Sequence, residues 1–157
     1  MQVKDVMTSK PSYCSQYWTV EAVAALMDHA GTGIVPVVEE LLHRKLAGVV
    51  TDRDLCLRVV APGKYPAQTW VKECMTSRPT CCHPEDSVET ALQLMRDKRV
   101  RRLPVVDQQM QLQGMLSISD FIRCDGVDRT LLYDTLKGIC QRSCTFEAGT
   151  ARMSRVA

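Results

Sequence analysis

Residues 48–57 read GVVTDRDLCL, and residues 114–123 read GMLSISDFIR. Each stretch contains a glycine, two apolar residues typical of a strand, a hydroxyl residue, and an aspartate three positions after the hydroxyl. The aspartate opens an apolar run with helical spacing, so each stretch predicts a strand that passes directly into a helix. The hydroxyl and the carboxylate then lie on one strand-to-helix turn.

The two polar groups of each turn have two possible roles. Thr51 with Asp54, and Ser117 with Asp120, suit a helix cap, because hydroxyl oxygens accept from first-turn N–H groups and acids favour the positive helix end. The same groups suit a nucleotide, because a carboxylate accepts from a vicinal diol while the hydroxyl and free N–H groups face a phosphate. A single copy favours the cap. The repetition in matching contexts strengthens the ligand-binding interpretation.

One constant offset relates the two halves of the chain. It pairs Val3 with Val71 near the start of each half, and Pro36–Val38 with Pro104–Val106 further along. After a turn of variable length, a slightly shorter offset pairs the two stretches quoted above. A single register over most of the chain indicates two copies of one unit, which is a more specific signal than any single motif.

Each unit predicts the element order β-α-β-β-α. Its first helix, near residues 20–27 or 88–95, carries apolar residues at i, i+3, i+4 and i+7. Asp86 with Glu89 predicts a capping box for the second of these helices, whereas the first starts at Trp18 without one. Together the two units predict an α/β (α+β) fold, followed by a C-terminal helix.

The strand before the variable turn contains a proline in each unit. Ile34–Val38 contains Pro36, and Leu103–Val106 contains Pro104. Because proline cannot donate a hydrogen bond to a ladder, both prolines predict an edge position or a strand end. After the turn, the two quoted stretches supply the next strand, and we expect the final helix of each unit to begin at its aspartate.

These patterns divide the chain into a first repeat at 1–60, a linker at 61–70, a second repeat at 71–124 and a C-terminal segment at 125–157. A unit of about 60 residues leaves much surface exposed, so we expect the repeats to share one interface where their matching turns approach. In the last segment, Asp128–Gln141 predicts a helix. Its apolar face carries Leu132, Leu136 and Ile139. The final stretch, EAGTARMSRVA, has little to bury and predicts a frayed end.

Composition excludes several classes of function. The chain has 157 residues, 45% of them apolar and 24% charged, with a formal net charge of +2, which is ordinary for a globular protein. The chain has no excess of basic residues, so its charge does not indicate nucleic-acid binding. The sequence contains no apolar signal segment and no run of roughly 18 apolar residues, so it does not indicate a membrane protein. We therefore expect a cytoplasmic protein.

Catalytic motifs are not found in the sequence. It has no glycine-rich P-loop, no HExxH motif, and no cysteine or serine nucleophile with an evident base. The three histidines, His29, His43 and His83, are scattered along the chain. The sequence therefore argues against an enzyme.

Eight cysteines suggest metal or redox chemistry, but none forms a CxxC pair. The best metal candidate is Cys81-Cys82 followed by His83, and Cys140-x3-Cys144 is the next. Residues 81–83 offer two or three ligands, whereas a closed zinc site needs four. We predict that they hold no structural metal, and that several cysteines are reduced thiols that pack as small apolar residues.

The paired motifs resemble a tandem of cystathionine-β-synthase (CBS) domains, the Bateman module. The resemblance rests on Met7-Thr8 with Met75-Thr76, on IVPV at 34–37 with RLPV at 102–105, and on the two stretches quoted first. It covers residues from about 3 to 124. It implies two repeats packed about a pseudo-twofold axis, with clefts that bind adenosine-containing ligands.

The resemblance also implies which residues hold such a ligand. The aspartate of each Ser/Thr-x-x-Asp turn would hold ribose hydroxyls, and the hydroxyl residue would approach a phosphate. Basic residues before the strand proline would reach phosphates, and these are Arg101 and Arg102 in the second repeat. The first repeat has Gly33 and Ile34 there, so we expect the better phosphate site in the second. The candidate nucleotide-binding residues are Ile34, Pro36, Thr51, Arg53, Asp54, Arg101, Arg102, Pro104, Ser117 and Asp120.

The function expected on these grounds is a regulatory module that senses AMP, ADP or ATP, needs no resident cofactor, and signals to an unidentified partner protein in trans. A homodimer is expected, because the first helices carry more apolar surface than one module covers. The residues concerned are Val23, Leu26, Met27, Leu94 and Met95. Two alternatives stay open. One is a structural or interaction protein with empty clefts and aspartates that only cap helices, and the other is a thiol- or metal-responsive variant.

Overall fold

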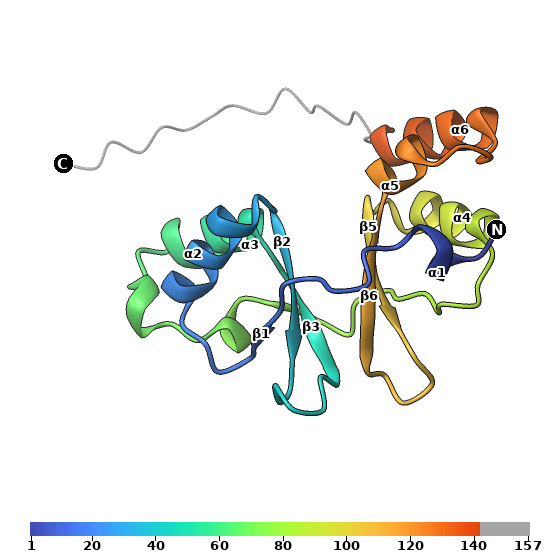
Figure 1. Cartoon of the computed structure of the whole chain (residues 1–157). Helices are drawn as coiled ribbons and strands as arrows, with labels where there is room; N and C mark the ends of the chain where they lie inside the picture. The colour runs from blue at the N-terminus through green and yellow to red at the C-terminus, as the bar shows by residue number, and fades with distance from the viewer. Residues whose placement is uncertain (142–157) are drawn as a thin grey trace, which may run out of the picture.

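The computed structural model describes residues 1–141. Within this range the chain forms a four-stranded sheet and a two-stranded sheet, each flanked by helices (Figure 1). None of the helices in this range has the length and apolar character that crossing a bilayer requires. The stretch predicted to be frayed, and Cys144, lie outside the described residues.

Both repeats follow the predicted order β-α-β-β-α. The first contains β1 (Cys14–Ser15), α2 (Val20–Ala30), β2 (Ile34–Val38), β3 (Leu46–Thr51) and α3 (Asp52–Leu55), which continues as a π-helical segment, Cys56–Val60. The second contains α4 (Val88–Lys98), β5 (Arg102–Val106), β6 (Leu112–Ser117) and α5 (Ile118–Arg123). Its first strand is reduced to one parallel bridge between Cys82 and Val105. The fold class predicted from the sequence is confirmed.

The strands of the two repeats lie next to each other in the middle of the molecule, and the helices cover its two outer sides (Figure 1). The Leu46 N–H donates to the Met110 carbonyl at 2.8 Å, and the Leu112 N–H donates to the Arg44 carbonyl at 2.9 Å. Leu46 and Leu112 are equivalent positions of the repeats, so the two bonds are related by a pseudo-twofold axis. A buried cluster fills this interface, made of Val38, Leu46, Val106 and Leu112.

The two repeats exchange their leading segments. Helix α1 (Val3–Val6) packs on the second repeat, where the Val3 side chain is fully buried and its N–H donates to the Asp86 carbonyl at 2.9 Å. Val71 is in turn fully buried in the core of the first repeat, and its N–H donates to the Trp18 carbonyl at 2.9 Å. The short strand β4 (Thr76–Ser77) then pairs with β3. Each core is thus completed by residues from the other half of the chain.

The glycine that opens each repeated stretch is required by this exchange. A Cβ atom at Gly48 would lie 2.6 Å from the carbonyl oxygen of Thr76, and one at Gly114 would lie 2.8 Å from that of Thr8. Carbon and oxygen atoms do not approach this closely without a shift of the backbone. The exchanged segments can therefore pair this closely with β3 and β6 only where the residue on the strand has a hydrogen atom in place of a side chain.

Both strand prolines lie where no ladder bond is lost. The Pro104 carbonyl accepts from Cys82 N–H at 3.1 Å, so this side of Pro104 faces away from β6, toward the single bridge that replaces a strand. In the first repeat, β1 pairs only with Val37 and Val38 of β2, and its pairing stops short of Pro36. Pro104 thus lies on an edge strand, as predicted. Pro36 is instead the third residue of β2, which lies between β1 and β3, so the edge or strand-end position predicted for Pro36 is wrong.

The helix starts differ from those predicted. Thr19 caps α2 by accepting from Ala22 N–H at 3.3 Å, so this helix does not begin uncapped at Trp18. Ser87 caps α4 by accepting from Thr90 N–H at 3.1 Å. The carboxylate of Asp86, the predicted cap, accepts instead from His83 N–H. Serine and threonine serve as well as aspartate at this position, and the local spacing does not decide between neighbours.

The final helices of the repeats also begin earlier than predicted. They start at Asp52 and Ile118, and Asp54 and Asp120 occupy their third positions. The residue before the helix, rather than the aspartate, therefore carries the N-cap role.

The predicted C-terminal helix is confirmed as α6 (Arg129–Cys140), which is capped by Asp128 and packs on α4. Four of its side chains are partly buried against the second core, namely Leu131, Leu132, Leu136 and Ile139. The surplus of apolar surface expected on the first helices is not found, because Val23, Met27 and Met95 are buried within the chain itself. That argument for a homodimer is wrong.

Candidate functional site

A cavity of about 410 Å³ lies between the two repeats. Its walls come from residues 8–12 of the exchanged N-terminal segment, from residues 30–36 of the first repeat, and from residues 102–123 of the second. The reciprocal packing of the repeats therefore builds the cavity, since no single repeat supplies all of its walls.

The turn of the second repeat forms part of this wall. The Asp120 Oδ2 atom accepts from the backbone N–H of Ser117 and from its hydroxyl, both at 2.7 Å. The Asp120 Oδ1 atom accepts from Arg123 Nη2, also at 2.7 Å. Asp120 is only 8% exposed. The cap role predicted for this turn is thus present, and the other carboxylate oxygen is aimed at a charged side chain that also lines the cavity.

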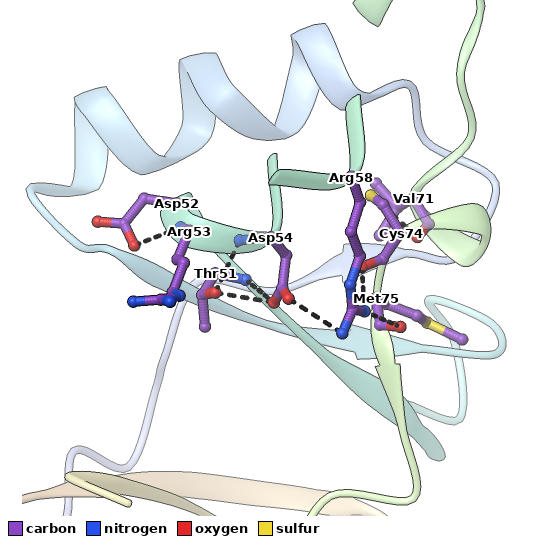
Figure 2. A network of polar contacts seen from close by, with 8 residues as sticks. All are labelled: Thr51, Asp52, Arg53, Asp54, Arg58, Val71, Cys74 and Met75. Atoms are coloured by element: carbon purple, nitrogen blue, oxygen red, sulfur yellow. Dashed lines mark hydrogen bonds and ion pairs between the residues drawn. The ribbon is translucent and has the colours of Figure 1, made fainter. Parts of the chain in front are cut away.

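The turn of the first repeat has the same internal geometry. The Asp54 Oδ2 atom accepts from Thr51 N–H at 2.9 Å and from the Thr51 hydroxyl at 2.7 Å. Its Oδ1 atom pairs with Arg58 Nη2 at 3.5 Å, and Arg58 Nη1 donates to the carbonyls of Cys74 and Met75 at 2.8 and 3.1 Å (Figure 2). Arg58 therefore ties this turn to the exchanged segment of the second repeat.

The structure brings half of the predicted site residues together. The cavity is lined by residues of both repeats, namely Ile34, Pro36, Arg102, Ser117 and Asp120. The remaining predicted residues do not line it, namely Thr51, Arg53, Asp54, Arg101 and Pro104.

The side chains of Arg101 and Arg102, at the start of β5, lie in different surroundings. The Arg102 side chain lines the cavity, whereas Arg101 Nη2 lies 3.9 Å from the Cys140 sulfur of α6. The Arg101 carbonyl accepts from Ile118 N–H at 3.0 Å and so holds the start of α5. Adjacent residues of an extended segment point to opposite sides, which separates the two arginines.

Two basic residues of the cavity were not found from the sequence. Lys10 lies immediately before Pro11, and the second repeat has Arg78 before Pro79, so a basic residue repeated before a proline was a usable signal. Arg123 had no such signal, because its equivalent in the first repeat is Leu57. The charged residues of the lining are thus Lys10, Arg102, Arg123 and Asp120. This excess of positive charge suits an anionic ligand.

A family model described as the CBS domain matches residues 3–61 and 71–126. The chain belongs to the CBS domain family. CBS domain-containing protein YhcV of Bacillus subtilis (strain 168) is 40% identical over 118 residues, which cover 75% of this chain and 81% of that protein. The tandem arrangement predicted from the repeats is therefore confirmed, and the match spans most of a stand-alone CBS protein.

Solved CBS structures with bound adenosine compounds have the same fold. CBSX2 in complex with AMP has a TM-score of 0.67 at 27% identity, and covers 78% of this chain and 93% of its own. The CBS domain pair of protein MJ0100, in complex with 5-methylthioadenosine and S-adenosyl-L-methionine, has a TM-score of 0.67 at 25% identity, with coverages of 78% and 94%. Related CBS pairs thus bind adenosine-containing ligands.

The two CBS repeats differ in charge beside their turns. In the first repeat, a Cβ atom at Gly33 would lie 2.6 Å from an oxygen of Asp52, so the Asp52 carboxylate lies directly against Gly33. The equivalent positions in the second repeat are Arg101 and Ile118. An acidic group therefore lies beside the Thr51 turn, where it opposes a phosphate, whereas the equivalent position at the Ser117 turn holds the apolar Ile118.

Several cysteines of the CBS pair pack as apolar residues, as predicted. Cys14, Cys74 and Cys82 are buried in the cores of the repeats. Burial raises the pKa of the Cys14 and Cys82 thiols to about 12 and that of Cys81 to about 11, so these thiols are neutral at pH 7. The seven cysteines of the described range are free thiols.

The residues of the best metal candidate face separate surroundings. Cys82 lies in the core of the second repeat, whereas Cys81 packs against the cluster between the repeats. The His83 Nδ1 atom lies 2.9 Å from the Val106 carbonyl oxygen. Over residues 1–141, no three His, Cys, Asp or Glu side chains are grouped so that they could hold a metal ion.

Proposed function

We propose that this CBS pair is a regulatory module that binds a phosphorylated adenosine, of the AMP, ADP or ATP class, in the cavity between its repeats. The observation that carries the proposal is the Ser117–Asp120 turn at the wall of a cavity that also contains Lys10 and Arg102. One surface thus offers a carboxylate that can bind a ribose diol and cationic side chains that can bind a phosphate.

The roles of the residues follow from their chemistry. Ile34, Pro36 and Met115 offer apolar surface for the adenine, and Asp120 accepts hydrogen bonds from the ribose hydroxyls. Lys10 and Arg102 contact the phosphate. Charge-assisted hydrogen bonds contribute roughly 1.5–3 kcal/mol each. Two or three of them beside an adenine slot are sufficient for micromolar affinity, about −8 kcal/mol.

A nucleotide is favoured over S-adenosylmethionine, although a structural relative binds the latter. S-adenosylmethionine carries a sulfonium cation next to the ribose, and this cation would approach Arg102 and Lys10. AMP carries a dianionic phosphate at the same place. Because three of the four charged residues of the lining are basic, we expect the phosphate to be preferred.

The proposed module acts without catalysis, in the cytoplasm, and through other proteins. We expect a homodimer that forms through the helices of the first repeat, because α6 covers α4 on the second. Val60, at the end of the π-helical segment of the first repeat, is 64% exposed. Ligand occupancy would then be transmitted to a partner protein in trans.

The competing function is an interaction protein whose cavity stays empty. It is favoured by the capping boxes, since Asp54 and Asp120 each already accept two hydrogen bonds within their turns. Isothermal titration calorimetry of the full chain with AMP, adenosine and S-adenosylmethionine separates the two. We expect binding of AMP at micromolar concentration with one site per chain, and weaker binding of the other two. No heat with any of the three ligands would favour the interaction protein.

A further inference from the structure

Two neighbouring cavities share the ion pair between Asp120 and Arg123 in their lining. One is the cavity of about 410 Å³ described above, and the other has a volume of about 330 Å³. Both cavities are lined by Thr8, Asp120 and Arg123. The Arg123 side chain is therefore a wall of the proposed site, held in place by a bond to the residue proposed to bind ribose.

The two partners of this ion pair differ strongly in exposure. The Asp120 side chain is 6% exposed, whereas that of Arg123 is 73% exposed. A buried carboxylate needs a partner for each oxygen, because desolvation of an unpaired charge costs several kcal/mol. Ser117 satisfies the Oδ2 atom, and Arg123 satisfies Oδ1. Any group that replaces Arg123 must therefore donate hydrogen bonds to Oδ1, as a ribose hydroxyl does.

Arg123 is held far less firmly than Arg58, the arginine that pairs with the equivalent aspartate of the first repeat. Arg58 pairs with Asp54 and also donates to two backbone carbonyls. Within residues 1–141, the guanidinium of Arg123 has one polar partner, which is Asp120. Arg123 is therefore free to change rotamer at the loss of a single contact, whereas Arg58 is fixed by three.

We propose that Arg123 is an exchangeable latch that makes the site selective for phosphorylated adenosines. The ribose hydroxyls of the ligand replace Arg123 at Asp120 Oδ1, and the released guanidinium turns to the ligand's phosphate. This inference rests on the proposed function. Arginine suits the second role, because its planar fork can bind phosphate oxygens through two parallel bonds.

The direction of the movement follows from the charges of the two cavities. The larger cavity contains Lys10 and Arg102, which attract a phosphate. The smaller cavity is lined by Asp5 as well as Asp120, so it repels a phosphate. The phosphate and the released Arg123 would therefore meet in the larger cavity.

The latch predicts opposite responses to two ligands that differ only in phosphate. Adenosine must displace Arg123 from Asp120 and offers nothing in exchange, whereas AMP offers its phosphate. Removal of the guanidinium should therefore weaken AMP and leave adenosine unchanged or bound more tightly. A purely structural role for Arg123 would weaken both ligands together.

The test is calorimetric titration of the full chain with AMP and with adenosine, for the wild type and for Arg123→Met. We expect Arg123→Met to lower AMP affinity about tenfold or more, and not to lower adenosine affinity. Arg123→Lys, which keeps the charge without the fork and preserves a partner for Asp120, should give an intermediate AMP affinity. Arg129→Met makes the same change in net charge at an exposed position of α6, and should alter neither affinity.

Two results would overturn the latch alone: AMP affinity unchanged in both Arg123 variants, or equal losses for AMP and adenosine. Failure of the wild type to bind AMP would overturn the proposed function and the latch with it.

Discussion

Thr8 and Met115 exchange two backbone hydrogen bonds, of 2.9 and 3.0 Å, although one belongs to the leading segment of the first repeat and the other to β6 of the second. Both residues also line the cavity between the repeats. The exchange of segments thus stabilises the fold and at the same time forms one wall of the proposed ligand site. A change that loosens this contact should affect stability and binding together.

Gly114 and Gly48 allow this coupling to be tested as a matched pair. Gly114→Ala places a Cβ atom 2.8 Å from the Thr8 carbonyl oxygen, and Gly48→Ala places one 2.6 Å from that of Thr76. Each substitution should lower the free energy of unfolding by about 1–3 kcal/mol in urea denaturation. Only Gly114→Ala should also weaken AMP, because Thr8 lines the cavity and Thr76 does not. Equal AMP affinities in the two variants would contradict this role of the exchanged segment.

The order of elements and the repeated turn could be predicted because their signals are local. Hydrophobic spacing, the two prolines and the Ser/Thr-x-x-Asp pattern each act over a few residues. The exchange of leading segments could not, because Val3 and Val71 read as part of the repeat that follows them and contact the other repeat only in three dimensions. Arg123 was missed for a related reason, since the first repeat has Leu57 at its position.

Arg101 and Arg102 look equivalent in the sequence but should differ in binding. Arg102→Met should weaken AMP and ATP by about tenfold, roughly 1.4 kcal/mol, and leave adenosine almost unchanged, because it removes a phosphate contact. Arg101→Met should alter none of the three, because the Arg101 side chain lies near Cys140 and outside the cavity. Calorimetry with the three ligands measures the difference. A loss of ATP affinity in Arg101→Met as large as in Arg102→Met would reject this assignment.

Alkaline pH should destabilise the protein through its buried thiols. Burial raises the pKa of Cys14 and Cys82 from 9.0 to about 12, so each thiol stays neutral in the folded state at pH values where it ionises in the unfolded chain. Their contribution to stability is complete below pH 9, and it is lost as the pH rises from about 9 toward 12.

This loss can be measured as the free energy of unfolding in urea between pH 8 and pH 11. The double variant Cys14→Ala, Cys82→Ala should show a smaller decrease over this range than the wild type. Cys140→Ala, which removes an exposed thiol, should show the same decrease as the wild type. An unchanged pH dependence in the double variant would mean that these thiols do not cause the loss.

The proposed homodimer should depend on the first repeat. Val60, at the end of the π-helical segment of the first repeat, is 64% exposed. Tyr133 is 66% exposed on α6, which already covers α4 of the second repeat. Val60→Asp should therefore weaken dimerisation about tenfold or more, because it places a charge in an apolar contact, and Tyr133→Asp should not. Light scattering over a concentration series measures both. A wild type that stays at 17.6 kDa at tens of micromolar would refute the dimer.

Asp120 carries the central claim, because both the ribose contact and the latch depend on its carboxylate. The most direct measurement is calorimetry of AMP and adenosine with Asp120→Asn, using Asp54→Asn as the matched control. Each variant keeps an oxygen that can accept from the hydroxyl residue of its turn, so the helix cap is largely preserved. We predict that Asp120→Asn weakens both ligands by about tenfold or more, whereas Asp54→Asn leaves binding in this cavity unchanged. Full AMP affinity in Asp120→Asn would contradict the account.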